Sequence, residues 1–239
     1  MKPAATADGV DILARGDLRP LGLLPRASNF TFLAEVVDRD RRALAVYKPR
    51  AGETPLWDFP AGTLCLREVA AYRLAGELGW PNVPPTVLRD GPHGEGSVQL
   101  FVQSAPEEHF FTLRERFPDV FRAVAGFDLV AGNGDRKSGH CLLAPDGRIW
   151  VVDHGLCFAA EPWVRTVIWD YAGQRVPAPL LEDLRRVEAS LRTGTLRGSL
   201  GGLLSDEEVD ATADRARALV EAGRFPAPGP GRSHPWPAI

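Results

Sequence analysis

The segment 128–158, DLVAGNGDRKSGHCLLAPDGRIWVVDHGLCF, restricts the fold and the chemistry of this chain more than any other part of it. Two short apolar runs in it, CLLA and IWVV, flank the strong turn sequence PDGR, and together they predict a β-hairpin. If the Asp and Gly of this turn are its two central residues, antiparallel pairing places His140 opposite Asp153. Asp135 lies on the loop just before the first strand. The hairpin therefore brings two carboxylates and an imidazole to one of its ends.

These three side chains suit the transfer of a phosphoryl group. Such a reaction needs a carboxylate to accept the proton of the attacking hydroxyl, and ligands for a metal that neutralises phosphate charge. Asp153 directly follows the apolar run IWVV, and a carboxylate at the end of a buried strand is costly unless it is paired or metal-bound. Structural interpretations stay open, because Asp135 sits beside a glycine and can form a turn, and His140 can bond to backbone as a loop histidine.

Zinc is a weaker interpretation of the same segment. A zinc site here would use His140, Cys141, His154 and Cys157. Residues 140 and 141 point to opposite faces of the predicted hairpin and no C-x-x-C is present, so we do not expect such a site.

The rest of the chain divides into a first half rich in strands and a second half rich in helices. Alternating and β-branched runs predict strands, and apolar residues at helical spacing predict helices. We expect strands at 30–37, 43–48, 83–88 and 97–102, and helices at 64–78, 110–126, 180–191 and 206–222. Gly79 ends the first of these helices and Ser205 caps the last. The pattern predicts an α+β chain whose two halves join near Ser104.

Composition argues against several classes of protein. With 239 residues, 44% hydrophobic and 25% charged, the chain has an ordinary globular composition. The net charge is −3 and the basic residues are scattered, which argues against a nucleic-acid partner. No segment reaches the roughly 18 apolar residues that span a bilayer, so we expect no stable membrane insertion. Three widely spaced cysteines argue against a disulfide framework and for a reducing, cytoplasmic setting.

Within the central segment, GNGDRKSGH resembles the catalytic loop of the protein-kinase-like superfamily. By this resemblance Asp135 takes the place of the catalytic Asp, and His140 takes the place of a metal-binding Asn. Asp153-His154-Gly155 resembles the DFG motif, whose Asp is the principal metal ligand. The sequence pattern G-x-GDR followed by V-x-D-H-G is most similar to that of the phosphatidylinositol 3- and 4-kinase branch and of the HipA-like kinases. The chain also resembles an actinobacterial family described as phosphatidylinositol-kinase-like.

The same resemblance assigns residues of the first half to ATP. Lys48, in AVYK, takes the place of the strand lysine of VAIK, and Glu68 that of the helix glutamate that pairs with it. Ser28 and Asn29 lie where a phosphate-covering loop belongs, although the G-x-G-x-x-G of typical kinases is missing. Further implied contacts are those of the hinge residues Gln99, Phe101 and Val102 with adenine, and of Lys137 with the γ-phosphate.

The resemblance implies a two-lobed protein-kinase-like fold, with a β-rich nucleotide-binding lobe at 1–104, a reduced helical catalytic lobe at 105–225 and an extended Pro/Gly-rich tail at 226–239. Roughly 80 residues follow Asp153, without an APE-like segment, so the second lobe is short. The implied activity is that of an ATP-dependent phosphotransferase that uses Mg²⁺ or Mn²⁺. The alternative is a pseudokinase or nucleotide-binding regulatory module that acts through a protein partner. The phosphoryl acceptor stays open among a protein, a lipid head group and a metabolite.

The histidine at position 140 leads to two finer expectations. An imidazole nitrogen is a poorer ligand for Mg²⁺ than the oxygen of Asn and a better one for Mn²⁺, so activity that uses His140 should favour Mn²⁺. A ligating imidazole must be neutral and free histidine titrates near about 6.5, so this activity should fall as the pH drops through the neutral-to-acid range. In the first half of the chain, we also expect an ion pair between Lys48 and Glu68.

Overall fold

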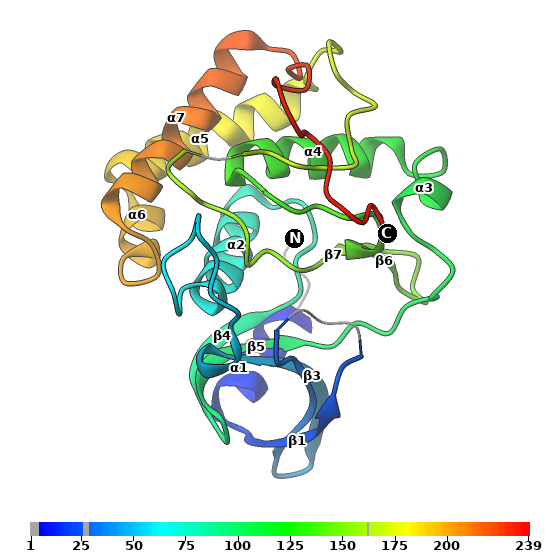
Figure 1. Ribbon diagram of the computed structural model, residues 1–239, viewed down its shortest axis with the longest axis vertical. Helices are drawn as coiled ribbons and strands as arrows, with labels where there is room; N and C mark the ends of the chain where they lie inside the picture. Colours follow the sequence, from blue (N-terminus) through cyan, green and yellow to red (C-terminus); the bar gives the residue numbers. More distant parts are fainter. Residues whose placement is uncertain (1–4, 26–28, 162) are drawn as a thin grey trace.

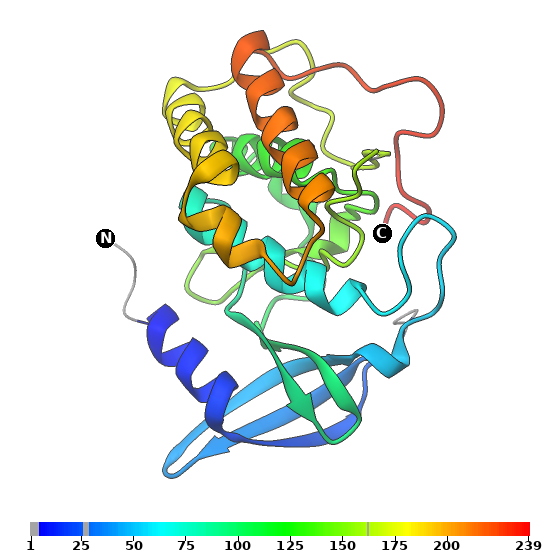
Figure 2. The same cartoon turned by 90° about the vertical axis from the view of Figure 1, so that its left-hand side faces the viewer.

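The computed structural model describes residues 5–25, 29–161 and 163–239 (Figure 1). Its strands are β1 (Asp17–Leu23), β2 (Phe32–Asp38), β3 (Arg41–Pro49), β4 (Thr86–Gly91), β5 (Gly94–Leu100), β6 (Cys141–Leu143) and β7 (Ile149–Val151). Its helices are α1 (Ala5–Arg15), α2 (Leu64–Leu78), α3 (Phe110–Leu113), α4 (Pro118–Ala131), α5 (Ala178–Thr193), α6 (Thr195–Leu200) and α7 (Asp206–Ala222), with 3₁₀ turns η1 (Arg50–Gly52) and η2 (Ser138–His140). The sheet with α1 and the group of helices from α4 to α7 form two layers, with α2 between them (Figures 1 and 2).

The first layer, which we call the sheet lobe, is a five-stranded antiparallel sheet in the order β1-β2-β3-β5-β4. The predicted hairpin of 30–37 and 43–48 is present as β2 and β3. In β3, Ala45 and Tyr47 are fully buried against α1 and the neighbouring strands, as the period of two predicts. Lys48 is therefore directed to the opposite face of the strand, toward the helices.

The first strand was not predicted from the sequence, and its composition explains why. The sequence DLRPLGL contains Pro20 and lacks apolar alternation, and the strand lies at the edge of the sheet with most of its residues exposed. Its pairing with β2 shifts between Pro20 and Gly22. With Leu18 as its one buried residue, this edge strand leaves no alternating pattern in the sequence.

The hairpin of β6 and β7 has a different register from the one that the sequence predicts. Cys141 pairs with Val151 and Leu143 with Ile149, so His140 lies opposite Val152 and not opposite Asp153. The reason is the turn, whose loop has three residues. The Ala144 N–H donates to the Arg148 carbonyl and the Gly147 N–H to the Ala144 carbonyl, both at 2.9 Å, with Gly147 in the left-handed region at φ 81°. The prediction of a two-residue turn was wrong by one position.

The helices match the predictions best where a cap signals their ends. Helix α2 spans the predicted residues and stops at Gly79, whose φ is 85°. Helix α7 begins after Ser205, whose hydroxyl accepts from the Glu208 N–H in a capping box. The single helix predicted at 110–126 is wrong, because the chain breaks into α3 and α4 before Pro118, which occupies the first turn of α4. No helix within the described residues has the length and apolarity needed to cross a bilayer.

The larger core of the protein lies among the helices and includes α2. Residues of this core come from α2, α3, α4, the β6–β7 hairpin and the helices α5 to α7, with Val69, Phe121, Phe127, Leu184 and Ala213 among the most deeply buried. Helix α2 is thus packed against the helical layer, which we call the helical lobe, while it also contacts β4 and β5. This position lets α2 place side chains at the junction of the two lobes.

The tail at 226–239 contains no helix or strand and runs back along the helical lobe toward β6 (Figure 1). The Ser233 carbonyl accepts hydrogen bonds from the Thr166 N–H at 3.1 Å and from the Trp169 indole at 3.0 Å. The Ala238 carbonyl accepts from the Ser138 N–H at 2.9 Å. The tail therefore contacts the loop that carries the candidate catalytic residues.

Candidate active site

A charged centre joins three elements that are far apart in the sequence. Lys48 is near the end of β3, Glu68 lies on α2, and Asp153 follows β7. The Lys48 Nζ atom donates to Asp153 Oδ1 at 2.8 Å and also forms an ion pair with the Glu68 carboxylate. The expected pair of Lys48 and Glu68 is therefore present. These side chains line a cavity of 190 Å³ together with Asn29 and Asp135.

The electrostatics of this centre hold it in its charged form. Burial alone would lower the pKa of Lys48, but the negative charges of Asp153 and Glu68 outweigh it and raise that pKa above its ordinary value. The positive charge of Lys48 in turn holds the pKa of Asp153 well below its usual range, against the opposing effect of burial. Lys48 and Asp153 thus both carry their charges at neutral pH.

Helix α2 is fixed at its start by a residue that the sequence analysis missed. The Glu53 carboxylate accepts hydrogen bonds from the Leu64 N–H at 3.1 Å and the Cys65 N–H at 2.8 Å, which are unpaired donors of the first helical turn. Further along α2, Glu68 Oε2 accepts from the His154 N–H at 3.1 Å. The cap and this second contact hold Glu68 beside both Lys48 and the segment that follows the hairpin.

Asp153 adopts a backbone conformation that few residues other than glycine favour. Its φ is 62°, in the left-handed region, where a side chain costs energy and the surrounding structure must hold it. The contacts on both sides do so, because the Val152 N–H donates to the His140 carbonyl at 3.0 Å and Glu68 holds the His154 N–H. This conformation directs the Asp153 carboxylate into the cavity.

Asp135 lines the same cavity from the loop after α4. Its N–H donates to Asn133 Oδ1 at 3.0 Å, and Lys137 Nζ lies 3.2 Å from Asp135 Oδ2. Burial raises the pKa of Asp135, an effect that the charge of Lys137 partly opposes. The raised pKa makes this carboxylate a better proton acceptor than an exposed aspartate.

A buried ion pair that the sequence analysis did not identify supports this loop. Arg136 and Asp128 are both fully buried, with Arg136 Nη2 2.9 Å from Asp128 Oδ1. Asn133 and Thr166 donate to the same carboxylate at 3.0 and 3.2 Å, and Arg136 Nη1 donates to the Val152 carbonyl at 2.8 Å. The pair therefore ties α4 and the Asp135 loop to the strand end that precedes Asp153.

Arg136 also determines the state of His154. Arg136 Nη2 lies 2.8 Å from His154 Nε2, so the imidazole accepts from a cation there. Burial, reinforced by the Arg136 charge, holds the pKa of His154 well below its ordinary value. A nitrogen that accepts from a guanidinium has no lone pair left for a metal, which agrees with the expectation that His154 is not part of a zinc site.

His140 lies against Asp153, with its Nε2 atom 3.3 Å from Asp153 Oδ2. Burial lowers the pKa of His140 to about 4, although the charge of Asp153 opposes the shift. The imidazole is therefore neutral in weakly acid solution. The pH at which we expect the ligating form to be lost moves from near 6.5 to about 4. Its Nδ1 accepts a long hydrogen bond, 3.3 Å, from the Lys137 N–H, so ligation through Nε2 requires a change of tautomer.

Asp153 and His140 lie side by side and could offer an oxygen and a nitrogen ligand to a divalent metal. The residues that the structure describes contain no group of three His, Cys, Asp or Glu side chains arranged for a metal ion. Mg²⁺ needs only one or two protein ligands when phosphate oxygens and water complete its octahedron. The pair thus fits a metal that arrives with a phosphorylated substrate better than a permanently bound ion.

The remaining predicted residues fall into three groups. Asn29 lines the cavity, and its Oδ1 accepts from the Thr54 N–H at 2.8 Å. Ser28 lies outside the described residues. Gln99 does not reach the cavity, because its amide donates to Thr86 Oγ1 at 2.8 Å within the sheet. Phe101 and Val102 follow β5 where the chain passes into the helical lobe, and they are not among the residues that line the cavity of Lys48.

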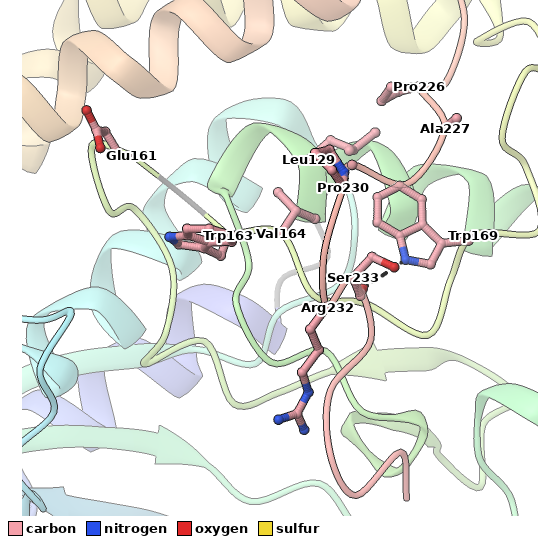
Figure 3. Close-up of a pocket in the computed structure, with 11 residues that line it drawn as sticks. Leu129, Glu161, Trp163, Val164, Trp169, Pro226, Ala227, Pro230, Arg232 and Ser233 are labelled. Atoms are coloured by element: carbon pink, nitrogen blue, oxygen red, sulfur yellow. Dashed lines mark hydrogen bonds between the residues drawn. The ribbon is translucent and has the colours of Figure 1, made fainter.

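Two of the further cavities on the helical lobe have Trp163 in their walls. One, of 480 Å³, lies between the tail and the segment after Asp153, with Trp163, Trp169 and Pro230 in its wall (Figure 3). The second, of 400 Å³, is lined by Gly134, Leu156, Trp163 and Arg165. Because Leu156 also lines the cavity of Lys48 and Gly134 precedes Asp135, the second cavity adjoins the Asp135 side of the charged centre.

The protein shares its fold with solved structures of very different sequence. The Helicobacter pylori proinflammatory kinase CtkA superposes with a TM-score of 0.50 at 13% identity, over 89% of this chain and 94% of that one. A structure of hydra Fam20 with sugar superposes with a TM-score of 0.56 at 12% identity, over 93% of this chain and 89% of that one. The fold is thus the two-lobed protein-kinase-like α+β fold, as the resemblance implied.

Two proteins of known name are similar in sequence, although no family model matches the chain. Rice phosphatidylinositol 4-kinase gamma 4 is 30% identical over 129 residues, which are 46% of this chain and 23% of that protein. Protein Rv2133c of Mycobacterium tuberculosis is 37% identical over 95% of this chain and 94% of its own length. At that identity and coverage, the chain belongs to the family of the mycobacterial protein Rv2133c.

Proposed function

We propose that this protein is a divalent-metal-dependent phosphotransferase that moves the γ-phosphoryl group of ATP to a hydroxyl of an acceptor. The observation that carries the proposal is the convergence of Lys48, Glu68, Asp135 and Asp153 on one cavity of 190 Å³. A lysine between two carboxylates, beside a third carboxylate of raised pKa, is the set that phosphoryl transfer uses. The kinase-like fold and the similarity to the rice protein give independent support.

Each residue has a role in this proposal. Lys48, oriented by Glu68, contacts the α- and β-phosphates. Asp153 and His140 hold the divalent metal, which when bound neutralises charge on the phosphate oxygens. Asp135 accepts the proton of the acceptor hydroxyl while the oxygen of that hydroxyl forms a bond to the γ-phosphorus. The bond from that phosphorus to the β,γ-bridging oxygen breaks, ADP leaves, and Lys137 balances charge on the transferred group.

The nucleotide base has a proposed place at the junction of the lobes. Phe101 and Val102 contact adenine in this proposal, and Gln99 supports them from inside the sheet through its bond to Thr86. Ser28 and Asn29 cover the phosphates, with Asn29 joined to the loop at Thr54.

Thermal denaturation with nucleotide tests the proposal. ATP with Mg²⁺ or Mn²⁺ should raise Tm, and the stabilisation should reach about 2.7 kcal/mol at 100 times the dissociation constant. Incubation with γ-labelled ATP and a cell extract should then transfer label to an acceptor. The absence of any Tm shift at millimolar nucleotide with either metal contradicts the proposal.

A regulatory nucleotide-binding module is the second candidate, and His140 is the observation that favours it. The imidazole replaces an oxygen ligand, and its Nδ1 accepts from the Lys137 N–H, which leaves Nε2 protonated. Under this alternative, nucleotide raises Tm but neither hydrolysis of ATP nor transfer of label follows. The same two measurements therefore separate the two functions.

A further inference from the structure

Arg165 is an arginine with an unpaired donor beside the proposed catalytic carboxylate. Its Nε atom is buried and finds no acceptor among the described residues. Its positive charge nevertheless reaches Asp135, whose pKa it lowers as a minor contribution beside burial and Lys137. A buried donor that is left unpaired costs free energy, so native structures rarely retain one without a reason.

The other buried and half-buried arginines of the helical lobe show how unusual this is. Arg136 is held by Asp128, and Arg197 bonds to Asp210 at 2.7 Å. Arg215 has no carboxylate partner within the described chain, yet its guanidinium donates to carbonyls of residues 130 and 159 at 2.8 and 3.1 Å. Arg165 has neither kind of partner among the described residues, so its guanidinium is available to a ligand.

The backbone of Arg165 is held on both sides of Asp135. The Arg165 N–H donates to the Asn133 carbonyl at 2.9 Å, and the Arg165 carbonyl accepts from the Arg136 N–H at 2.9 Å. The residue thus pairs with the chain shortly before and directly after Asp135. These two hydrogen bonds fix the backbone of Arg165 relative to the proposed proton acceptor, so the side chain starts from a defined place beside it.

The cavity that Arg165 lines indicates which substrate it would contact. Arg165 belongs to the 400 Å³ cavity with Gly134, Leu156 and Trp163, and does not line the cavity of Lys48, where the nucleotide phosphates are proposed to lie. A ligand in the cavity of Arg165 would lie beside Gly134, the neighbour of Asp135 in the sequence, and outside the cavity proposed for the nucleotide phosphates. An acceptor held there would not compete with the nucleotide for the cavity of Lys48.

The rim of the same cavity limits the charge of the ligand. Asp58, Glu161 and Glu207 line it, so a ligand with several negative charges would be repelled. One anionic group can reach Arg165 while the rest of the ligand passes the rim. The exposed ring of Trp57 adds an apolar surface at this edge.

We infer that Arg165 binds the single anionic group, a phosphate monoester or a carboxylate, of a hydroxyl-bearing acceptor and so sets the substrate class of the enzyme. That the ligand is the phosphoryl acceptor rests on the proposed function, whereas the anion site itself rests on Arg165 and its cavity. A planar guanidinium is suited to bidentate contact with either anion.

Binding of three matched small molecules tests the inference. Glycerol 3-phosphate and glycerate carry the two anions, and glycerol is their neutral control; each is titrated into the protein without nucleotide by calorimetry. At least one anion should bind with a millimolar dissociation constant, and glycerol should not. Arg165→Gln should weaken that binding by about 10- to 100-fold, since hydrogen bonds to charged groups contribute that much. Comparison of the two anions distinguishes a phosphate site from a carboxylate site.

Two control variants locate the effect. Arg185 is an exposed arginine of α5, and Arg185→Gln should leave anion binding unchanged. Lys48→Met tests the other location: loss of anion binding in this variant and not in Arg165→Gln places the anion in the cavity of Lys48 and overturns the inference. Failure of both anions to bind at tens of millimolar overturns it as well. The shift of Tm by Mg–ATP, which Arg165→Gln should retain, is measured separately, so the proposed function can fail or stand independently.

Discussion

Lys48 Nζ lies 2.8 Å from Asp153 Oδ1, although 105 positions separate the two residues in the sequence. The contact joins β3 of the sheet lobe to the segment that follows β7 in the helical lobe. Glu68 completes it from α2, the helix between the lobes. Paired charges therefore join the two lobes at the cavity of Lys48, and replacement of the central cation should affect the stability of the protein as well as the proposed nucleotide binding.

Lys48→Met should lower the free energy of unfolding by about 1–3 kcal/mol, because among the described residues it leaves the buried Glu68 carboxylate with only the His154 N–H as a partner. Urea denaturation measures the change. The double variant Lys48→Met, Glu68→Gln should lose less than the sum of the two single variants, since the pair is removed together. Additive losses would show that the two side chains do not stabilise each other.

Asp135→Asn should abolish phosphoryl transfer and retain the rise in Tm with Mg–ATP. The reason is that Asp135 is assigned to the acceptor proton, which the amide cannot take, while Lys48 and Asp153 remain to bind the nucleotide. Asp153→Asn is the matched comparison, and it should reduce the Tm shift itself. Equal loss of nucleotide binding in both variants, or full turnover in Asp135→Asn, contradicts the division of roles.

The parts of the site that the sequence predicts are those with local signals. Lys48 lies near the end of a strand that the alternation of side chains predicts. Glu68 lies on a helix whose apolar spacing and terminal Gly79 are both visible in the sequence. The convergence of Asp135, His140 and Asp153 was expected even though the predicted register was wrong by one. A three-residue loop still returns the chain to the same end of the hairpin, and His140 remains 3.3 Å from Asp153.

The residues that the sequence did not reveal act through partners at spacings that no local pattern marks. Arg136 follows Asp135 directly, yet its partner Asp128 lies 8 positions earlier on the buried end of α4, where an aspartate resembles any polar helix residue. Glu53 caps a helix that starts 11 positions later. Only the break before α4 had a readable signal, Pro118, which favours the first turn of a new helix.

Arg136→Met should destabilise the protein by about 3–5 kcal/mol, because it leaves the fully buried Asp128 carboxylate without its cation. Arg148 provides the control, since its pair with Asp146 is exposed to solvent and Arg148→Met should change the free energy of unfolding much less. Denaturant titration of both variants gives the comparison. Similar small losses in the two would mean that Asp128 is adequately held by Asn133 and Thr166.

Removal of residues 233–239 should reduce turnover more than nucleotide binding. The Ser233 carbonyl holds the segment of Thr166, and the Ala238 carbonyl holds Ser138 of the loop between Lys137 and His140. None of these tail residues lines the cavity of Lys48. Hydrogen exchange should become faster at 136–140 and 163–169 in the shortened chain. Unchanged exchange and unchanged turnover would limit the tail to packing of the surface.

His140→Asn should convert a preference for Mn²⁺ into efficient use of Mg²⁺, because the amide oxygen is the harder ligand. The pH dependence has a defined sign. Folded His140 has a pKa of about 4 and the unfolded residue one near about 6.5, so the imidazole stays neutral, and competent to ligate, until the pH approaches 4. Activity limited by this group should therefore persist through about pH 5 and not decline near 6.5.

The lowered pKa of His140 also makes the free energy of unfolding depend on pH. Between about pH 6.5 and pH 4 this histidine is protonated in the unfolded chain and neutral in the folded protein. The free energy of unfolding therefore falls as the pH drops, by up to about 3 kcal/mol from this residue. His140→Asn removes that contribution, while His154, also held neutral by burial, keeps its own. Denaturation of both proteins at about pH 7 and about pH 5 measures the difference. If the variant shows the same metal preference and the same dependence of stability on pH, His140 is an ordinary loop histidine.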